Sequence, residues 1–229
     1  MNEGLPIKGI RTLSLIDYPK KMSAVVFLGG CNFRCPYCHN MELVMEPNKS
    51  ENIAEDFILE ELQRRKKFLD AVVLTGGEPA LYPGIIPFAK KIKEMGYLVK
   101  LDTNGYTPAI IKQIEKEKAV DFISMDIKTA LDAKKYAKAA GVSVELSKIQ
   151  QSIDYLIKGT VDYEFRTTVI DGFVSLEDVR EIAERIKDCK SYYLQGANAG
   201  LKDFPGPEPE KLEELAEELR RKGMQIFYR

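Results

Sequence analysis

Tryptophan is absent from this chain of 229 residues, and histidine occurs only once, as His39. A single histidine excludes histidine acid–base chemistry elsewhere in the chain, and no Ser-His-Asp set, P-loop or GxGxxG pattern is recognisable. No run approaches the roughly 18 apolar residues of a membrane-spanning helix. Residues 1–20 also lack the apolar centre of a secretion signal. We therefore expect a cytoplasmic protein without a membrane partner.

An excess of charge of one sign is also missing. The chain carries 35 acidic and 34 basic residues, which gives a net charge of −1. Proteins that bind nucleic acid through their overall charge are strongly basic, so we do not expect nucleic acid among the partners. Hydrophobic residues make up 45% of the chain. That share is sufficient for a folded core and excludes global disorder.

Cysteine is scarce, but it is unevenly distributed. Cys31, Cys35 and Cys38 lie within eight residues, and the fourth cysteine is Cys189. A secreted scaffold held together by disulfides is shorter and richer in cysteine. A tight cysteine cluster in a chain without a secretion signal instead indicates a metal site in a reducing compartment.

Apolar strands alternate with amphipathic helices along the chain. Strands are expected at residues 24–28, 71–75, 97–102, 120–127, 163–170, 192–194 and 224–228. Helices are expected at 51–68, 85–95, 108–118, 131–139, 146–158, 176–187 and 208–221, the first of them capped by Ser50. This order predicts parallel βαβ units in a single domain of residues 1–229, either an open partial barrel or a doubly wound sheet.

Chemically unusual residues follow these strands, one group at each carboxyl end. Because the carboxyl ends of parallel strands meet at one edge, where α/β proteins bind their ligands, we expect these residues to form one site. In strand order they are the cysteines, Gly76-Gly77-Glu78-Pro79, Asp102-Thr103-Asn104-Gly105, Asp126 with Lys128, Arg166, and Gln195.

The spacing Cys31-x3-Cys35-x2-Cys38 places three thiolates on one short loop. Three thiolates can hold three irons of a [4Fe–4S] cluster and leave the fourth iron open for a ligand. Zinc is the alternative metal, and a structural zinc site has four ligands. His39 directly follows Cys38, and adjacent residues seldom reach one ion together, so the fourth zinc ligand would have to be Cys189. A loop without any metal is the remaining alternative.

The stretch Cys31-Asn32-Phe33-Arg34-Cys35-Pro36-Tyr37-Cys38 resembles the cluster loop of radical S-adenosylmethionine (SAM) enzymes, with Tyr37 at the aromatic position. His39-Asn40 narrows the resemblance to the enzymes that activate glycyl radical enzymes. Residues 13–19, Leu-Ser-Leu-Ile-Asp-Tyr-Pro, are similar to the same segment in the enzymes that activate anaerobic ribonucleoside-triphosphate reductase. They depart from the Asp-Gly-Pro-Gly of pyruvate formate-lyase activators. The resemblance covers nearly the whole chain.

The resemblance implies a radical SAM core, which is a partial (β/α)6 TIM-like barrel, with a [4Fe–4S] cluster and SAM as cofactors. Cys31, Cys35 and Cys38 would be the catalytic metal ligands. Cleavage of SAM would give a 5′-deoxyadenosyl radical that takes a hydrogen from a glycine of a partner glycyl radical enzyme. The partner would be of the anaerobic ribonucleotide reductase or pyruvate formate-lyase type.

An electron must also reach the cluster. No cysteine lies between Cys38 and Gly76, where some activators carry extra clusters, so the resemblance implies an external donor such as flavodoxin or ferredoxin. The run Arg64-Arg65-Lys66-Lys67 is either a solvated helix face or a docking site for such an acidic partner.

The resemblance also assigns roles to the residues at the strand ends. Tyr37 belongs to the cofactor site, Gly76, Gly77 and Glu78 contact the amino group of SAM, and Gln195 stands where related activators carry a histidine near the adenosine. Asp17 belongs to the substrate side. Further SAM contacts are implied for Asp102, Thr103, Asn104, Asp126, Lys128 and Arg166, of which Arg166 lies near the carboxylate and Asp102, Thr103 and Asp126 can hold a monovalent cation. The ordinary interpretation of such residues is as turns or surface ion pairs.

Two other functions stay open at this point. The same SAM chemistry can act on a small molecule or an RNA, because a fold does not determine its substrate. The cysteines can also belong to a metal-binding protein without enzyme activity.

Overall fold

The computed structural model describes residues 4–196 and 203–228. In this part of the chain one sheet holds eight strands in the order β1 to β8, each beside its neighbours in the sequence. β1 is antiparallel to β2, and all later pairs are parallel. A doubly wound sheet reverses its strand order at a switch point, so the sequential order corresponds to the barrel. The strands are β1 Ile7–Tyr18, β2 Lys21–Leu28, β3 Ala71–Gly76, β4 Leu98–Thr103, β5 Phe122–Asp126, β6 Asp162–Thr168, β7 Tyr192–Gln195 and β8 Ile226–Tyr228.

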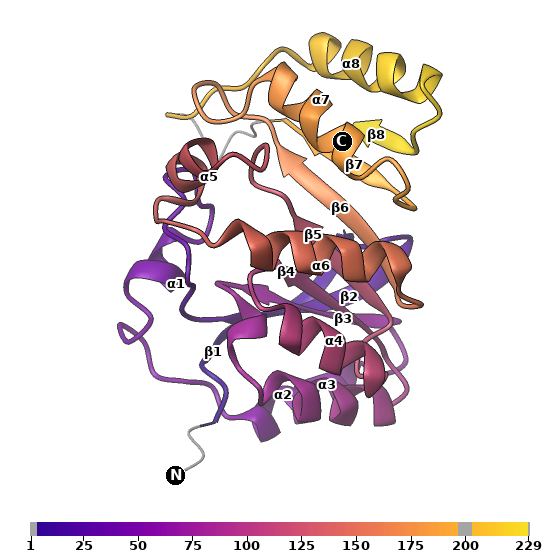
Figure 1. The fold of residues 1–229 in the computed structure, drawn as a ribbon. Coiled ribbons are helices and arrows are strands. Elements are labelled where there is room, and N and C mark those ends of the chain that lie inside the picture. Colours follow the sequence, from indigo (N-terminus) through magenta and orange to yellow (C-terminus); the bar gives the residue numbers. More distant parts are fainter. Residues whose placement is uncertain (1–3, 197–202, 229) are drawn as a thin grey trace.

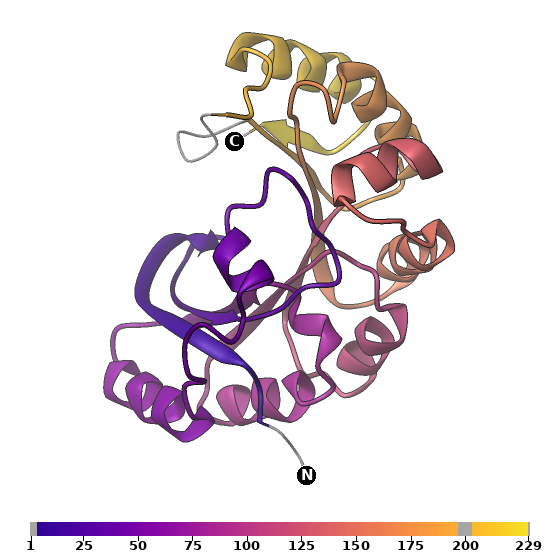
Figure 2. The ribbon, with the colours of Figure 1, turned by 90° about the vertical axis from the view of Figure 1, so that its left-hand side faces the viewer.

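Helices follow the strands from β2 to β7 and cover the outer face of the curved sheet (Figure 1 and Figure 2). Each of these strands therefore opens one β/α unit, and the predicted partial (β/α)6 TIM-like barrel is confirmed, with β8 added at its edge. No helix among the described residues is long and apolar enough to cross a membrane. The helices are α1 Met41–Met45, α2 Glu55–Arg65, the 3-10 helix η1 Pro79–Leu81, α3 Ile85–Glu94, α4 Pro108–Lys116, α5 Ala133–Ala140, α6 Leu146–Lys158, α7 Leu176–Arg185 and α8 Pro209–Arg221.

β1 is the strand that the sequence analysis missed. It lies at the edge of the sheet, and its register against β2 shifts between Ile7 and Gly9, between Arg11 and Ser14, and between Ser14 and Tyr18. Such bulges interrupt the alternation of inward and outward side chains, so residues 7–18 show no clear period of two.

The predicted cap of the first long helix is wrong. α2 begins at Glu55, and its N-cap is Ala54 rather than Ser50. The residues before Glu55 stay outside the helix because the backbone N–H of Ile53 donates to the carbonyl of Ile7 at 2.8 Å. A contact with β1 thus overrides the local capping preference of serine.

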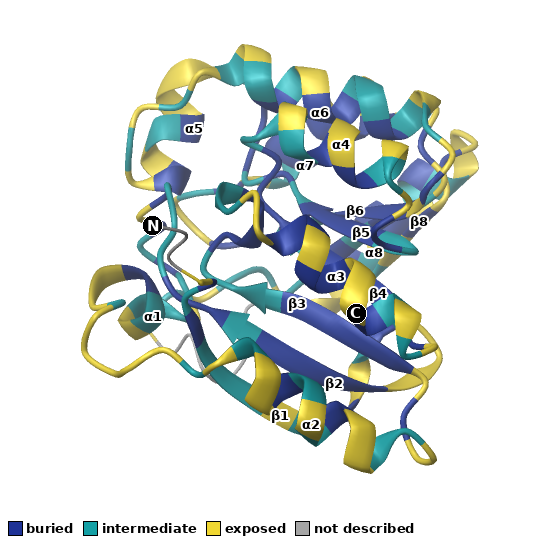
Figure 3. Ribbon diagram, turned by 90° about the horizontal axis from the view of Figure 1, so that it is seen from below, coloured by how far each residue is buried: buried dark blue, intermediate teal, exposed yellow. Residues whose placement is uncertain are grey.

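The concave face of the sheet changes character along the strands. Near the amino ends it holds a small apolar cluster, which we call the lumen floor. Two residues further along the same strands the inward side chains are polar, because alternate residues share a face. Figure 3 shows that the inner strands are mostly buried, whereas the edge strand β1 is largely intermediate or exposed. The lumen floor consists of Tyr18, Val25, Ala71 and Val73, with Phe27, Leu98 and Phe122 packed against them.

Candidate active site

A cavity of about 350 Å³ opens at the carboxyl ends of the strands. Its volume falls within the range of small-molecule pockets, roughly 300–1,000 Å³. Every residue predicted for the cluster or for SAM lines this cavity, namely Cys31, Cys35, Tyr37, Cys38, Gly76, Gly77, Glu78, Asp102, Thr103, Asn104, Asp126, Lys128, Arg166 and Gln195. Residues far apart in the sequence therefore meet at one place, as the strand order predicts.

The cysteine loop follows β2 and lies between the strand ends and α5. The backbone N–H of Arg34 donates to the carbonyl of Ala140 at 2.7 Å, which ties the loop to the end of α5. Burial raises the pKa of the Cys31 thiol to about 11 and also raises the pKa of Cys35. Both thiols are therefore protonated at neutral pH in the free chain, and a metal must displace these protons when it binds.

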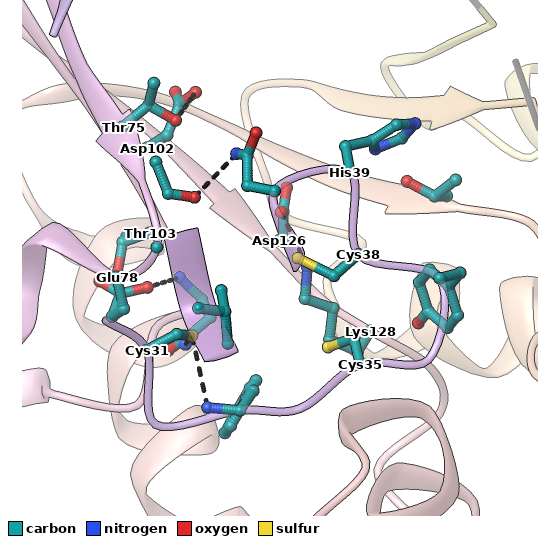
Figure 4. Close-up of a pocket in the computed structure, with 18 of the residues that line it drawn as sticks. Cys31, Cys35, Cys38, His39, Thr75, Glu78, Asp102, Thr103, Asp126 and Lys128 are labelled. Atoms are coloured by element: carbon teal, nitrogen blue, oxygen red, sulfur yellow. Dashed lines mark hydrogen bonds and ion pairs between the residues drawn. The ribbon is translucent and has the colours of Figure 1, made fainter. Parts of the chain in front are cut away.

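The arrangement of the thiols distinguishes between the two candidate metals. Figure 4 shows Cys31 on one side of the cavity and Cys35 with Cys38 on the other. Among the described residues, no three His, Cys, Asp or Glu side chains converge on a point that one ion would occupy. Each thiolate of a [4Fe–4S] cluster binds its own iron, so its ligands surround a wider group. The donor set thus fits the cluster better than a single zinc, and Cys189 does not line the cavity.

Glu78 is buried at the end of β3, and its carboxylate is directed into the protein. It accepts hydrogen bonds from the Thr103 hydroxyl at 2.8 Å, from the Asn104 N–H at 2.6 Å and from the Ala80 N–H at 2.9 Å. Burial raises the pKa of Glu78 to about 7, although these hydrogen bonds oppose the shift. The carboxylate therefore joins the loop after β3 to the loop after β4.

Gly76 and Gly77 are required by the neighbouring loop. A Cβ at position 77 would lie 1.8 Å from the carbonyl oxygen of Gly30, and one at position 76 would lie 2.4 Å from that of Leu28. Gly76 also has a φ of +116°, which only glycine adopts readily. The resemblance assigns these glycines to the amino group of SAM, and the structure shows that they also let two backbone segments approach each other.

Five charged side chains inside the barrel, Lys100, Asp102, Asp126, Lys128 and Arg166, form what we call the lumen network. Arg166 lies 2.8 Å from Asp126 and 3.5 Å from Asp102, and Lys128 lies 3.0 Å from Asp126. Burial opposes ionisation of Asp126, but the charges of Arg166 and Lys128 outweigh it and hold its pKa well below the usual range. Arg166 and Lys100 likewise lower the pKa of Asp102. Both carboxylates are therefore ionised and paired.

Lys100 is the member of this network that the sequence analysis missed. Its side chain is buried, and its ammonium group lies 2.9 Å from the Asp102 carboxylate. It also donates to the backbone carbonyl of Asp17 at 2.6 Å. The signal was available, because Lys100 is a charge within the apolar run Leu98-Val99-Lys100-Leu101.

Uncharged polar residues were missed for lack of such a signal. Thr75 lines the cavity and donates to Asp102 at 3.2 Å, and Thr168 lines it at the end of β6. Asn40, which the sequence analysis used for the family resemblance but gave no role in the site, donates from its side chain to the carbonyl of Gly76 at 2.8 Å. Only their place at a strand end or beside the cysteines could have identified them.

Asp17 is the one predicted site residue that does not line the cavity. Tyr18 pairs with Lys21 at the start of β2, so Asp17 lies at the amino ends of the strands, away from the cysteine loop. Its carboxylate accepts a hydrogen bond from the Ser14 hydroxyl and lies 3.8 Å from Arg11. Only its backbone carbonyl is linked to the site, through Lys100.

The family of the chain is apparent from comparison with known proteins. A model of the radical SAM superfamily matches residues 25–186. The chain is 38% identical over 223 residues to a Methanocaldococcus jannaschii protein provisionally named a glycyl-radical enzyme activating enzyme, with 91% of this chain and 89% of that protein covered. It is 28% identical over 240 residues to the pyruvate formate-lyase-activating enzyme of Clostridium pasteurianum, with 93% and 96% covered.

Solved structures agree on the fold. Streptococcus suis SuiB bound to S-adenosylmethionine matches with a TM-score of 0.67 at 16% identity, over 87% of this chain and 48% of that one. The chain thus spans about half the length of SuiB, and this likeness concerns the fold alone. Taken with the family match and the first relative, it shows that the chain belongs to the radical SAM superfamily, as an enzyme of the type that activates glycyl radical enzymes.

Proposed function

We propose that this enzyme uses a [4Fe–4S] cluster to cleave SAM and to transfer a hydrogen atom from a glycine Cα of a partner glycyl radical enzyme to the 5′-deoxyadenosyl radical. The observation that carries the proposal is that the three motif cysteines line one cavity together with four residues of the lumen network, Asp102, Asp126, Lys128 and Arg166. The similarity to a pyruvate formate-lyase-activating enzyme supports this class of partner. An anaerobic ribonucleotide reductase is the other candidate partner.

Cys31, Cys35 and Cys38 would hold the cluster, and their number leaves one iron for SAM. When bound and reduced, the cluster supplies the electron that breaks a carbon–sulfur bond of SAM. The loop is positioned for this role by bonds from outside it: Arg34 is tied to α5, and the Asn104 amide lies 3.8 Å from the Cys31 sulfur.

The remaining lining residues suit the charges of SAM. Lys128 and Arg166 offer cations to its carboxylate, for which a guanidinium fork is well shaped. The ionised Asp102 and Asp126 offer acceptors to its ammonium and favour its sulfonium. Glu78 acts differently, because its carboxylate already accepts three hydrogen bonds within the protein. We assign Glu78 the role of holding the two loops in place. Backbone carbonyls and the two aspartates would then bind the ammonium group of SAM.

A monovalent cation at Asp102, Thr103 and Asp126 stays a prediction. Arg166 lies between the two aspartates, and the Thr103 hydroxyl donates to Glu78. A bound cation would therefore compete with Arg166 for the same oxygens. The roles of Tyr37 and Gln195 at the cofactor site and of Asp17 toward the substrate are likewise predictions, and the position of Asp17 does not favour a direct contact.

The alternative functions and the alternative metal have less support. Membership in an enzyme family argues against a metal-binding protein without activity, and the spread of the thiols argues against zinc. A small molecule or RNA as substrate would leave the SAM chemistry unchanged. It would alter only the molecule from which the radical takes a hydrogen atom.

The test begins with low-temperature EPR of the anaerobically reconstituted, reduced enzyme with and without SAM. We expect a [4Fe–4S]⁺ signal whose shape changes when SAM is added. Incubation with SAM, reductant and a purified glycyl radical enzyme should then give a glycyl doublet.

Each step has its own contrary result. A cluster signal that ignores SAM would overturn the assignment of the open iron. A SAM-dependent signal and SAM cleavage without a doublet, for every glycyl radical enzyme of the source organism, would shift the substrate to a small molecule or RNA.

A further inference from the structure

The chain has two exposed basic surfaces, and the structure places them at opposite ends of the barrel. The run Arg64–Lys67 spans the end of α2 and leads into β3, so it lies at the amino ends of the strands. The second surface lies beside the cysteine loop and consists of Arg34, Lys134 and Lys138. We call it the α5 face, because both lysines belong to α5. Figure 1 shows α5 at the same end of the sheet as α1, where the strands end.

The α5 face is in direct contact with the cysteine loop. The bond from the Arg34 N–H to the Ala140 carbonyl joins the loop to the last residue of α5. The next residue, Gly141, has a left-handed backbone, and a Cβ there would lie 2.0 Å from the carbonyl oxygen of Arg34. The loop that carries the cysteines is therefore packed closely against the end of this helix.

The cations of the α5 face lack acidic partners. Arg34, Lys134 and Lys138 are exposed, and none has a carboxylate within ion-pair distance among residues 4–196 and 203–228. Lys135, on the same helix, is paired with Asp178 at 2.7 Å and is not counted in the face. One guanidinium nitrogen of Arg34 donates hydrogen bonds to the backbone carbonyls of Cys31 and Phe33. The face therefore carries uncompensated positive charge.

The other side of the cavity mouth has an excess of negative charge. There α1 and the turn after it carry Glu42 and Glu46, which share a single cation, Lys49. The Arg64–Lys67 run is also partly neutralised, because Arg64 and Arg65 both pair with Glu61. Of these three surfaces, only the α5 face combines free positive charge with contact to the cysteine loop.

An aromatic patch lies beside Lys138 on the α5 face. The ammonium of Lys138 lies 5.4 Å from the centre of the Phe173 ring. Phe173 is partly exposed and contacts Phe204 at 6.0 Å and Tyr37 at 5.3 Å between ring centres. Tyr37 itself lines the cavity. One layer of side chains thus separates the surface from the cavity at this point, and an apolar centre with a charged rim is typical of protein interfaces.

We propose that the α5 face is the docking site of a small acidic electron-transfer protein that reduces the cluster. This inference rests on the proposed function, since it requires a cluster in the cavity. One electron leaves the reduced carrier, which is oxidised by one electron, and the cluster is reduced by one electron, with no bond made or broken. Opposite charge speeds such encounters and makes them sensitive to salt.

The experiment compares two charge reversals of equal size. Lys134→Glu/Lys138→Glu alters the α5 face, and Arg64→Glu/Lys67→Glu is the matched control at the other end. Purified flavodoxin serves as the probe, and its binding to each reconstituted enzyme is measured by titration calorimetry at low and at 0.5 M salt. Stopped-flow absorbance then follows reduction of the cluster by reduced flavodoxin and, separately, by dithionite.

We expect the α5 double variant to bind flavodoxin about tenfold more weakly at low salt and to be reduced by it about tenfold more slowly. High salt should remove most of the difference. The control variant should bind and react as the parent enzyme does. Dithionite should reduce all three proteins at the same rate and give the same SAM-dependent EPR change, which keeps this test separate from that of the proposed function.

Three results would overturn the proposal. Equal losses in both double variants would mean that flavodoxin responds only to overall charge. Unchanged binding in the α5 variant would place the donor elsewhere. Normal binding of flavodoxin with a lower yield of glycyl radical under dithionite would assign the face to the glycyl radical enzyme instead.

Discussion

The lumen floor and the lumen network meet on β4 and β5, where their residues lie two to four positions apart. On β4 the inward positions run from Leu98 to Lys100 and Asp102, and on β5 they run from Phe122 to Asp126. At the amino ends these positions pack against one another without polar partners. At the carboxyl ends each charge of the lumen network lies beside an opposite charge. The comparison shows that burial imposes different rules on the two halves: apolar contact in one, and complete pairing in the other.

The two halves also differ in what they contribute. Apolar burial stabilises the fold, whereas buried ion pairs are weak contributors to stability because desolvation offsets their attraction. We infer that the floor supports the barrel and that the network is retained for the ligand. The following variants test this division, beginning with the largest effect.

Cys38→Ala should abolish function while leaving the fold intact. Removing one of three ligands prevents a stable cluster, so the EPR signal and SAM cleavage should be lost. Cys38 is only partly buried, and the free energy of unfolding of the cluster-free chain should change by less than about 1 kcal/mol. Anaerobic EPR and urea denaturation of the cluster-free proteins measure the two quantities. A cluster of full intensity in the variant would contradict the ligand assignment.

Lys100→Met should affect both halves, because Lys100 stands between them. The variant leaves the Asp102 carboxylate with one cation fewer and frees the Asp17 carbonyl, so we expect a loss of about 3 kcal/mol. Hydrogen exchange should accelerate at residues 14–21, and the SAM-induced EPR change should require more SAM. Lys93→Met is the control, since Lys93 pairs with Asp121 near the surface and should cost at most about 1 kcal/mol. Equal exchange rates at residues 14–21 in parent and variant would show that Lys100 does not hold β1.

Glu78→Gln should reveal the raised pKa of this carboxyl group, which is about 7 against an ordinary value of 4.5. Between these two pH values the folded state binds more protons than the unfolded state, so the contribution of Glu78 to stability falls as pH rises. Glutamine cannot titrate. The destabilisation caused by the substitution should therefore be larger at pH 5 than at pH 8, by at most about 3 kcal/mol. A difference that is constant or grows with pH would contradict the assignment.

Val73→Ala should weaken the fold without touching the site. Val73 is fully buried in the lumen floor, and the loss of two methyl groups there should cost about 2 kcal/mol. The SAM dependence of the EPR signal should match that of the parent, because Val73 does not line the cavity. A shift in SAM affinity as large as that of Lys100→Met would remove the distinction between floor and network.

Much of the site could be predicted because its signals are local. The cysteine spacing lies within eight residues, and each further group directly follows an apolar strand. Parallel strand order then brings the groups to one edge, whatever the details of packing. The capping of α7 by Ser175 could be expected for the same reason, since its partner Asp178 is only three residues away.

The features that were missed depend on contacts across the chain. Lys100 meets Asp17 over 83 residues, and Ile53 meets Ile7 in place of a helix cap at Ser50. β1 lacks a regular pattern because bulges shift its register. The basic run Arg64–Lys67 is conspicuous in the sequence, but the path of α2 places it at the far end of the barrel.

The sequence by itself determined the order of the strands from β2 to β8 and of the long helices, the cysteine loop and most of the polar residues that line the cavity, because these follow from short-range periodicity and from the parallel order of the strands. The tertiary structure alone decided that Glu78 serves the loops, that Asp17 lies away from the cavity and that the α5 face lies beside the cysteines. These facts depend on which surfaces come into contact after folding, and hydrogen bonding and charge pairing between distant segments leave no periodic trace in the sequence.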